Sequence, residues 1–223
     1  IYHDKHYNFK KNIHDNAHNI MLSYNSNLTK LDYKGKSILD LWKHYRKILL
    51  RVSVDGYPPI YEYIRTHKEI QDVENNIKTV TSELSNVKLS ATCTTSVLNI
   101  TRLTDIFEYF NSIGAYIHTS LVQYPQALNP RILPIDMKKE ITDNWNRWLD
   151  NIDENISKDL QSNIDLNTQI KSAKRYGNQV IRYMNSKDQF NDWYKFIDYA
   201  TILDAHHKTN ILDVYPEFKP YWK

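Results

Sequence analysis

Four short apolar segments alternate with segments of helical periodicity over the first 122 residues. The second apolar segment, ILLRVSV, is rich in β-branched residues, which predicts a buried strand of a parallel sheet. The third places Val87, Leu89, Ala91 and Cys93 on one face, the alternation of a strand. The four predicted strands are residues 19–26, 48–54, 87–95 and 115–122.

Helix-starting and helix-ending residues lie between these strands. We expect Ser37 with Asp40, and Thr66 with Glu69, to form capping pairs that begin the first two helices. Asn99 or Thr101 caps the third helix, and Gly114 ends it. The apolar positions of the three helices are Ile38, Leu41, Trp42 and Tyr45; Ile70, Val73, Ile77 and Val80; and Leu103, Ile106, Phe107 and Phe110.

This strand–helix alternation predicts an α/β fold with one parallel sheet and right-handed crossovers. Ligands of such sheets bind beyond the carboxyl ends of the strands. The rule selects four loops as the candidate site: Asn25–Thr29, Ser53–Arg65, Thr95–Asn99 and Leu121–Asn129.

The pattern changes after Pro134, where helical spacing continues almost to the end. We therefore divide the chain into residues 1–133, which contain the sheet, and 134–223, a helical region that packs on it. Residues 211–218 are expected to form an extended hydrophobic tail. The apolar positions that predict the helices are Met137, Ile141, Trp145, Trp148 and Ile152; Ile156, Leu160 and Ile164; Tyr176, Val180, Tyr183 and Met184; and Phe190, Trp193, Ile197, Ala200 and Leu203.

Composition narrows the class of protein. The chain has 223 residues, is 41% hydrophobic and contains one cysteine, Cys93, which excludes an internal disulfide and a cysteine-rich metal site. No apolar stretch reaches the ~20 residues of a membrane span, and the first residues lack a signal-peptide core, so we expect a cytoplasmic protein. The net charge of +3 is dispersed, which disfavours a nucleic-acid partner. Ile1 is not Met, which suggests that a segment precedes it.

Six short motifs follow one another through the predicted site loops. In this order they resemble the later part of the catalytic barrel of radical S-adenosylmethionine proteins, closest to the phage and bacterial group with a twitch domain. The segments Phe196–Asp204 and Val214–Glu217 are similar to the closing helix and tail of that group. The motifs are YNSNLT (24–29), LW (41–42), VSVDG (52–56), EYIR (62–65), ENNI (74–77) and TTSVLNI (94–100).

The resemblance implies a partial, TIM-like β/α barrel of which this chain supplies the second half. It implies a [4Fe–4S] cluster and S-adenosylmethionine, whose reductive cleavage yields a 5′-deoxyadenosyl radical, with the hard chemistry carried by the cofactors. Ser53 matches the serine that bonds S-adenosylmethionine. Arg65 matches the arginine near its carboxylate, where a guanidinium fork suits a bidentate partner.

The resemblance assigns the remaining cofactor-binding positions by their places in the barrel. Asn27 faces the cofactor from the third strand, and Asp55 contacts the ribose or the substrate. Thr95 and Asn99 lie at the end of the fifth strand, and Val122 lies where the sixth strand covers the adenine. Four of the seven residues also have a structural interpretation: Ser53 ends a strand, Asp55 turns the chain, Arg65 lies on the surface and Asn99 is a helix N-cap.

The departures from the family pattern concern the metal. The CxxxCxxC loop whose three thiolates bind the cluster is missing, as is the glycine–glycine–glutamate motif for the methionine amino group. Cluster ligands would therefore come from an upstream portion or from a complementary chain. The alternative is a non-catalytic scaffold or binding protein derived from such a barrel.

Overall fold

The computed structural model describes residues 14–65, 69–157 and 164–222. The chain divides into two compact units, and each is described by itself. Unit 1 comprises Ile1–Ser53 with Glu69–Ala91, and unit 2 comprises Val54–Lys68 with Thr92–Lys223. Thr66 of the second expected capping pair and the helical position Leu160 lie outside the described residues. Glu69, the other member of that pair, is described and makes no side-chain capping hydrogen bond.

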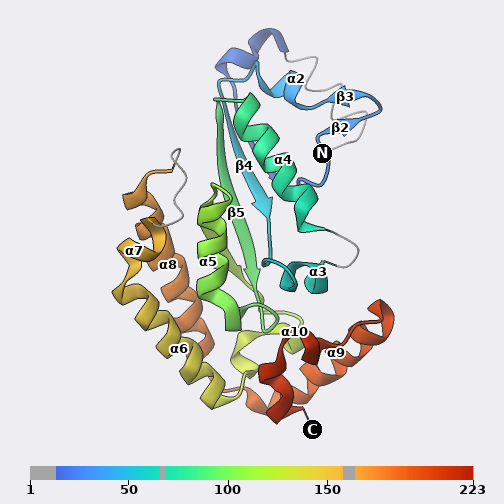
Figure 1. Cartoon of the computed structure of the whole chain (residues 1–223), viewed down its shortest axis with the longest axis vertical. Coiled ribbons are helices and arrows are strands. Elements are labelled where there is room, and N and C mark those ends of the chain that lie inside the picture. Colours follow the sequence, from blue (N-terminus) through green and yellow to red (C-terminus); the bar gives the residue numbers. More distant parts are fainter. Residues whose placement is uncertain (1–13, 66–68, 158–163, 223) are drawn as a thin grey trace. The chain divides into compact units, whose positions relative to one another are not determined.

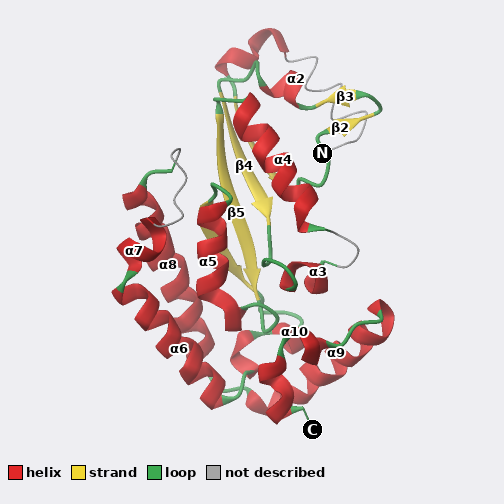
Figure 2. Ribbon diagram, viewed as in Figure 1, coloured by secondary structure: helices red, strands yellow, loops and turns green. Residues whose placement is uncertain are grey.

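A four-stranded parallel sheet in the order β1-β4-β5-β6 confirms the predicted α/β class (Figures 1 and 2). The strand order in the sheet follows the chain order, as the strand–helix alternation predicts. The strands are β1 (Met21–Ser26), β4 (Lys47–Ser53), β5 (Val87–Thr95) and β6 (Tyr116–Leu121).

Unit 1 buries one face of its strands and leaves the other exposed. In the register of β1 and β4, Tyr24 pairs with Leu50, and both are buried, whereas Asn25 pairs with Arg51, and both are exposed. The prediction of a buried strand at ILLRVSV therefore holds for one face only: the four apolar residues of that face are buried, whereas Arg51 is exposed and Leu49 and Ser53 are half-buried.

The helix α4 (Ile70–Glu83) lies over the strands of unit 1 in Figure 1. It buries the four predicted positions, because residues three and four apart share one helix face. The other elements of unit 1 are η1 (His14–Asn19), β2 (Asp32–Tyr33), β3 (Lys36–Ser37) and α2 (Leu39–Trp42).

The segment before α2 differs from the prediction. The capping pair is absent: Ser37 Oγ accepts a hydrogen bond from the Leu39 N–H at 3.2 Å, while Asp40 pairs with Lys43. A hairpin of β2 and β3 precedes it, turning through Lys34 and Gly35 at positive φ. Ser37 ends a strand here, and the helix that follows, Leu39–Trp42, is four residues long.

Unit 2 packs helices around β6 and the second half of β5. The buried amide of Gln169 accepts a hydrogen bond from the Ile117 N–H of β6 at 3.2 Å. The Nε2 atom of the same amide donates to Asn111 Oδ1 at 2.6 Å and to the Ala115 carbonyl at 3.0 Å. These bonds tie α8 to β6 and to the end of α5.

The helices of unit 2 confirm the predicted helical region, except at its end. The expected extended tail was wrong, because residues 211–214 and 216–221 are helical. Asp204 Oδ2 accepts from the Ile211 N–H at 2.8 Å, and Asn210 Oδ1 accepts from the Leu212 N–H, so side chains cap this short helix. The helices are α3 (Ile60–Ile64), η2 (Ile100–Arg102), α5 (Leu103–Ser112), η3 (Gln126–Leu128), η4 (Pro130–Ile132), α6 (Ile135–Asp150), α7 (Ile152–Ser157), α8 (Leu166–Asn185), η5 (Phe190–Asp192), α9 (Trp193–His207), α10 (Ile211–Val214) and η6 (Pro216–Tyr221).

Within the described ranges, no helix combines the length and the apolar character that a bilayer span requires.

Candidate functional site

A cavity of about 460 Å³ opens at the carboxyl ends of β1 and β4 in unit 1. This volume lies in the range of small-molecule sites. Two predicted residues, Asn27 and Ser53, line it together although 26 positions separate them in the sequence. The lining residues are Asn25, Ser26, Asn27, Leu28, Thr29, Lys30 and Ser53.

The loop that forms one wall of the cavity is held in an unusual conformation. Leu28 has a φ of +49° and is fully buried, so the apolar side chain anchors a left-handed turn. That backbone conformation costs roughly 1–2 kcal/mol in a residue with a side chain. Ser26 Oγ accepts from the Leu28 N–H at 2.9 Å, and Asn76 of α4 donates to the Leu28 carbonyl at 2.8 Å, which offsets the strain.

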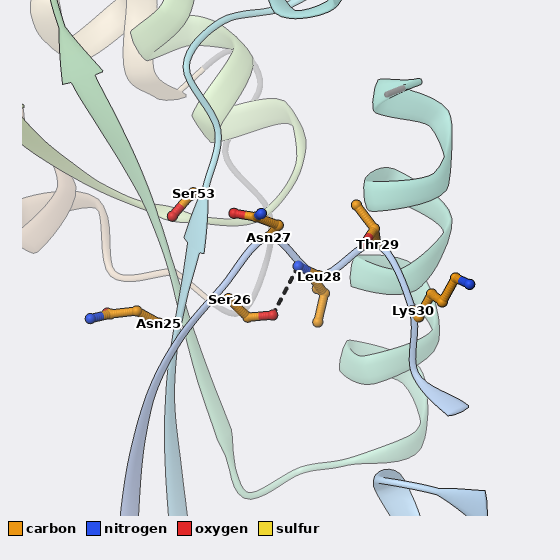
Figure 3. Close-up of a pocket in the computed structure, with 7 residues that line it drawn as sticks. All are labelled: Asn25, Ser26, Asn27, Leu28, Thr29, Lys30 and Ser53. Carbon is orange, nitrogen blue, oxygen red and sulfur yellow. Dashed lines mark hydrogen bonds between the residues drawn. The ribbon is translucent and has the colours of Figure 1, made fainter. Parts of the chain in front are cut away.

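The polar side chains of the cavity face different ways (Figure 3). Asn25 and Ser53 project to the side of the strands away from α4, and the Asn27 amide is directed toward Ser53. Lys30 points away from this group. Among the described residues, neither the Asn25 side chain nor the Ser53 side chain has a hydrogen-bond partner, so an amide and a hydroxyl are available to a bound molecule.

A second group of predicted residues lies in unit 2, around the carboxylate of Asp55. Asp55 Oδ2 accepts from Arg65 Nε at 2.8 Å and contacts Arg65 Nη2 at 2.6 Å. Asp55 Oδ1 accepts from the Thr94 N–H at 2.8 Å. The carboxylate is thus held by a charge-assisted fork and a backbone donor, the strong type of hydrogen bond.

Asn99 completes this network from the beginning of η2. Its Nδ2 donates to the Asp55 carbonyl at 3.0 Å and to the Thr94 carbonyl at 3.1 Å. Its Oδ1 accepts from the Ser96 N–H at 2.8 Å. Asn99 occupies the N-cap position of η2, yet its side chain makes no capping bond and instead ties the loop after β4 to the end of β5.

The remaining predicted residues contribute backbone and packing to the same end of unit 2. The Val122 N–H donates to the Thr95 carbonyl at 2.9 Å, which joins the ends of β6 and β5. Thr95 is buried, and Val122 is half-buried. The predicted set therefore falls into two groups, Asn27 with Ser53 in unit 1 and the other five residues in unit 2.

Cys93 is a buried residue of β5. Burial raises the pKa of its thiol well above the ordinary value, so the thiol stays protonated at neutral pH. Asn99 Nδ2 lies 3.4 Å from its sulfur. A single, protonated and buried thiol does not fit a cluster that needs three thiolates. In the part of the chain that the structure describes, no three His, Cys, Asp or Glu side chains gather as a metal-binding group.

Models of known protein families and functionally characterised proteins give no match to this sequence. The resemblance carried by the six motifs is accordingly a prediction that rests on the motifs and on their positions in the fold.

Sequence reasoning selected Asn25 as the first residue of a candidate loop but missed Arg51, which lies beside it on the neighbouring strand. They are directly opposite each other in the register of β1 and β4, on the exposed face. The signal that finds them is the alternation of the strands: once Tyr24, Leu50 and Val52 are assigned to the buried face, their neighbours must face the other way. The motif series did not include Arg51, because it selected residues at the strand ends.

Proposed function

We propose that this chain is the S-adenosylmethionine-binding second half of a radical S-adenosylmethionine partial barrel. One observation carries the proposal: residues 25–29 and Ser53, which belong to two motifs of the series, line one cavity at the carboxyl ends of adjacent parallel strands. Ligand sites of parallel α/β folds occupy that position. In a barrel, helices cover the outer face of the sheet, and the exposed polar face of β1 and β4 then corresponds to the interior.

The donor set of the cavity fits a polar nucleoside ligand. Ser53 offers a hydroxyl that donates and accepts, and Asn25 offers an amide that does both, so these groups match ribose hydroxyls and amino acid groups. When bound with its cluster, S-adenosylmethionine supplies a radical that abstracts hydrogen. In this proposal the residues of this chain bind and orient the cofactor.

The Asp55–Arg65–Asn99 network has a positioning role in this proposal. Asp55 and Arg65 are hydrogen-bonded to each other, and Asp55 and Asn99 form hydrogen bonds with backbone groups at the ends of β4 and β5. Because the Arg65 Nε and Nη2 atoms are engaged by Asp55, the arginine holds an internal carboxylate here. Its expected bond to the carboxylate of the cofactor stays a prediction.

Calorimetric titration of the full chain with S-adenosylhomocysteine, a stable analogue, tests the proposal. Loss of one hydrogen bond is worth about 0.5–1.5 kcal/mol, so Ser53→Ala and Asn27→Ala should each weaken binding roughly 2–12-fold. Ser82→Ala, on the exposed surface of α4, is the matched control and should bind as the wild type does. A wild-type chain that does not bind the analogue contradicts the proposal.

The alternative is a binding protein that has the barrel scaffold but no cluster. The single buried cysteine favours it for this chain taken alone. Iron and sulfide analysis of the native complex after anaerobic purification separates the two. About four irons per complex with a cysteine-rich partner segment supports the enzyme, whereas an iron-free complex that still binds S-adenosylhomocysteine supports the binding protein.

A further inference from the structure

The exposed face of the sheet in unit 1 is basic. Three of its side chains are cations: Lys47 and Arg51 of β4 and Lys88 of β5, all exposed. Among the strand positions that the structure describes on that face, none is an aspartate or a glutamate. Its positions are Met21, Ser23 and Asn25 of β1, Lys47, Leu49, Arg51 and Ser53 of β4, and Lys88 and Ser90 of β5.

Arg51 is the cation of this face that lies nearest the cavity. It precedes Ser53 by two residues, which places it about 7 Å away along the strand and on the same side of it. Asn25, which lines the cavity, is its direct partner on the neighbouring strand. Arg51 therefore extends the polar surface of the cavity along the sheet.

The guanidinium of Arg51 has no carboxylate or other acceptor among the described residues. Two arginines of unit 2 differ from it in this respect: Arg65 is paired with Asp55, and Arg102 with Glu217. A planar fork of five donors suits carboxylate and phosphate groups. An exposed basic face without acidic residues attracts the same groups from solution.

We infer that the ligand of the cavity includes an anionic group, a carboxylate or a phosphate, and that Arg51 binds this group on the exposed face of the sheet. The inference rests on the proposed function, since it extends the same binding site. The anionic group belongs either to the methionine portion of S-adenosylmethionine or to a second molecule, the substrate. Lys47 and Lys88 add to the attraction from farther along the face.

Titrations of the full chain with three probes test the inference and identify the source of the anion. S-adenosylhomocysteine has the methionine carboxylate, 5′-methylthioadenosine lacks it, and inorganic phosphate, followed by phosphorus NMR line broadening, represents a separate anion. The variants are Arg51→Gln, Arg51→Lys and the control Arg46→Gln. Arg46 is an exposed arginine immediately before β4, at the opposite end of the strand.

A charge-assisted hydrogen bond is worth about twice a neutral one, so Arg51→Gln should weaken anion binding roughly 10-fold or more. Arg51→Lys should restore part of the affinity, because a point charge lacks the fork. Arg46→Gln should have no effect. A loss with S-adenosylhomocysteine but not with methylthioadenosine assigns the methionine carboxylate, and a loss with phosphate alone assigns a second molecule.

Two outcomes would overturn the inference, and they can be told apart. If Arg51→Gln binds all three probes as the wild type does while Ser53→Ala still weakens S-adenosylhomocysteine, the inference about the anion fails and the proposed function survives. If the wild-type chain binds neither S-adenosylhomocysteine nor phosphate, both fail together.

Discussion

Replacement of Asn99 by alanine tests whether the network at the ends of β4 and β5 is a structural device. The Asn99 side chain makes three hydrogen bonds to backbone groups, at 3.0, 3.1 and 2.8 Å, and the residue is only 1% exposed. In the variant, two carbonyls and one N–H group would lose these partners where water has little access.

The magnitude follows from the number of bonds. Each buried neutral hydrogen bond contributes about 1 kcal/mol net, so Asn99→Ala should lower the free energy of unfolding of unit 2 by about 3 kcal/mol. For a chain of this size that corresponds to a fall of roughly 6–12 °C in Tm. We expect Asn99→Ala to weaken ligand binding only to the extent that the loops after β4 and β5 shift.

Urea unfolding followed by tryptophan fluorescence is a suitable assay, because four of the five tryptophans, Trp145, Trp148, Trp193 and Trp222, lie in unit 2. The matched control is Asn185→Ala. Asn185 also donates two hydrogen bonds, at 3.0 and 3.1 Å, but it is exposed, so water replaces them and the cost should stay within about 0.5 kcal/mol. A cost below about 1 kcal/mol for Asn99→Ala would refute the reasoning.

Three further substitutions probe unit 2. Gly177→Ala should destabilise by about 2–3 kcal/mol in urea unfolding, because its Cβ would lie 2.1 Å from the ring of Trp145, and overpacking costs this much. Gln169→Leu should cost about 3 kcal/mol and accelerate amide exchange at β6, since it removes three buried bonds. Burial and a hydrogen bond to Asp136 raise the pKa of Tyr221 to about 12. The stability from this group is complete below pH 10 and is lost as the pH rises to about 12, a loss that Tyr221→Phe should abolish.

Each of these substitutions has an outcome that argues against its stated cause. Gly35→Ala provides the contrast for Gly177, because Gly35 has a φ of +73° with no atom within 4 Å of an added Cβ, so only backbone strain of about 1 kcal/mol applies. Equal costs at the two glycines would exclude the clash with Trp145. A Gln169→Leu variant as stable as the wild type would show that the three bonds contribute no net stability. If the alkaline loss persists in Tyr221→Phe, it arises from another tyrosine.

Helices and strands whose own residues show a clear hydrophobic periodicity can be predicted from the sequence. Strand β5 and helix α4 occur where alternation and three-to-four spacing place them, since each buries one continuous stripe of side chains. The tail at residues 211–218 could not be predicted in the same way. Its first turn depends on the Asp204 carboxylate, seven positions earlier, and no local pattern reports that contact.

In the candidate site, too, the sequence predicts the positions of residues but not the contacts that their side chains make after folding. The order of the motifs suffices to place Asn27 and Ser53 at adjacent strand ends, because parallel strands expose their carboxyl ends together. It does not reveal which polar groups are already satisfied. That the Asp55 carboxylate engages the fork of Arg65 follows from a contact between residues ten positions apart, which the chain forms only after folding.

The pairing of Asp55 with Arg65 also changes which arginine can recognise a ligand. A guanidinium whose Nε and Nη2 atoms are directed at an internal carboxylate has fewer donors for a second one, and separating the pair would leave a largely buried charge uncompensated. Arg51 has no carboxylate partner among the described residues and lies on the polar face beside the cavity. Anion recognition therefore belongs, in our proposal, to the strand interior of β4, whereas the residues after its end hold the loops in place.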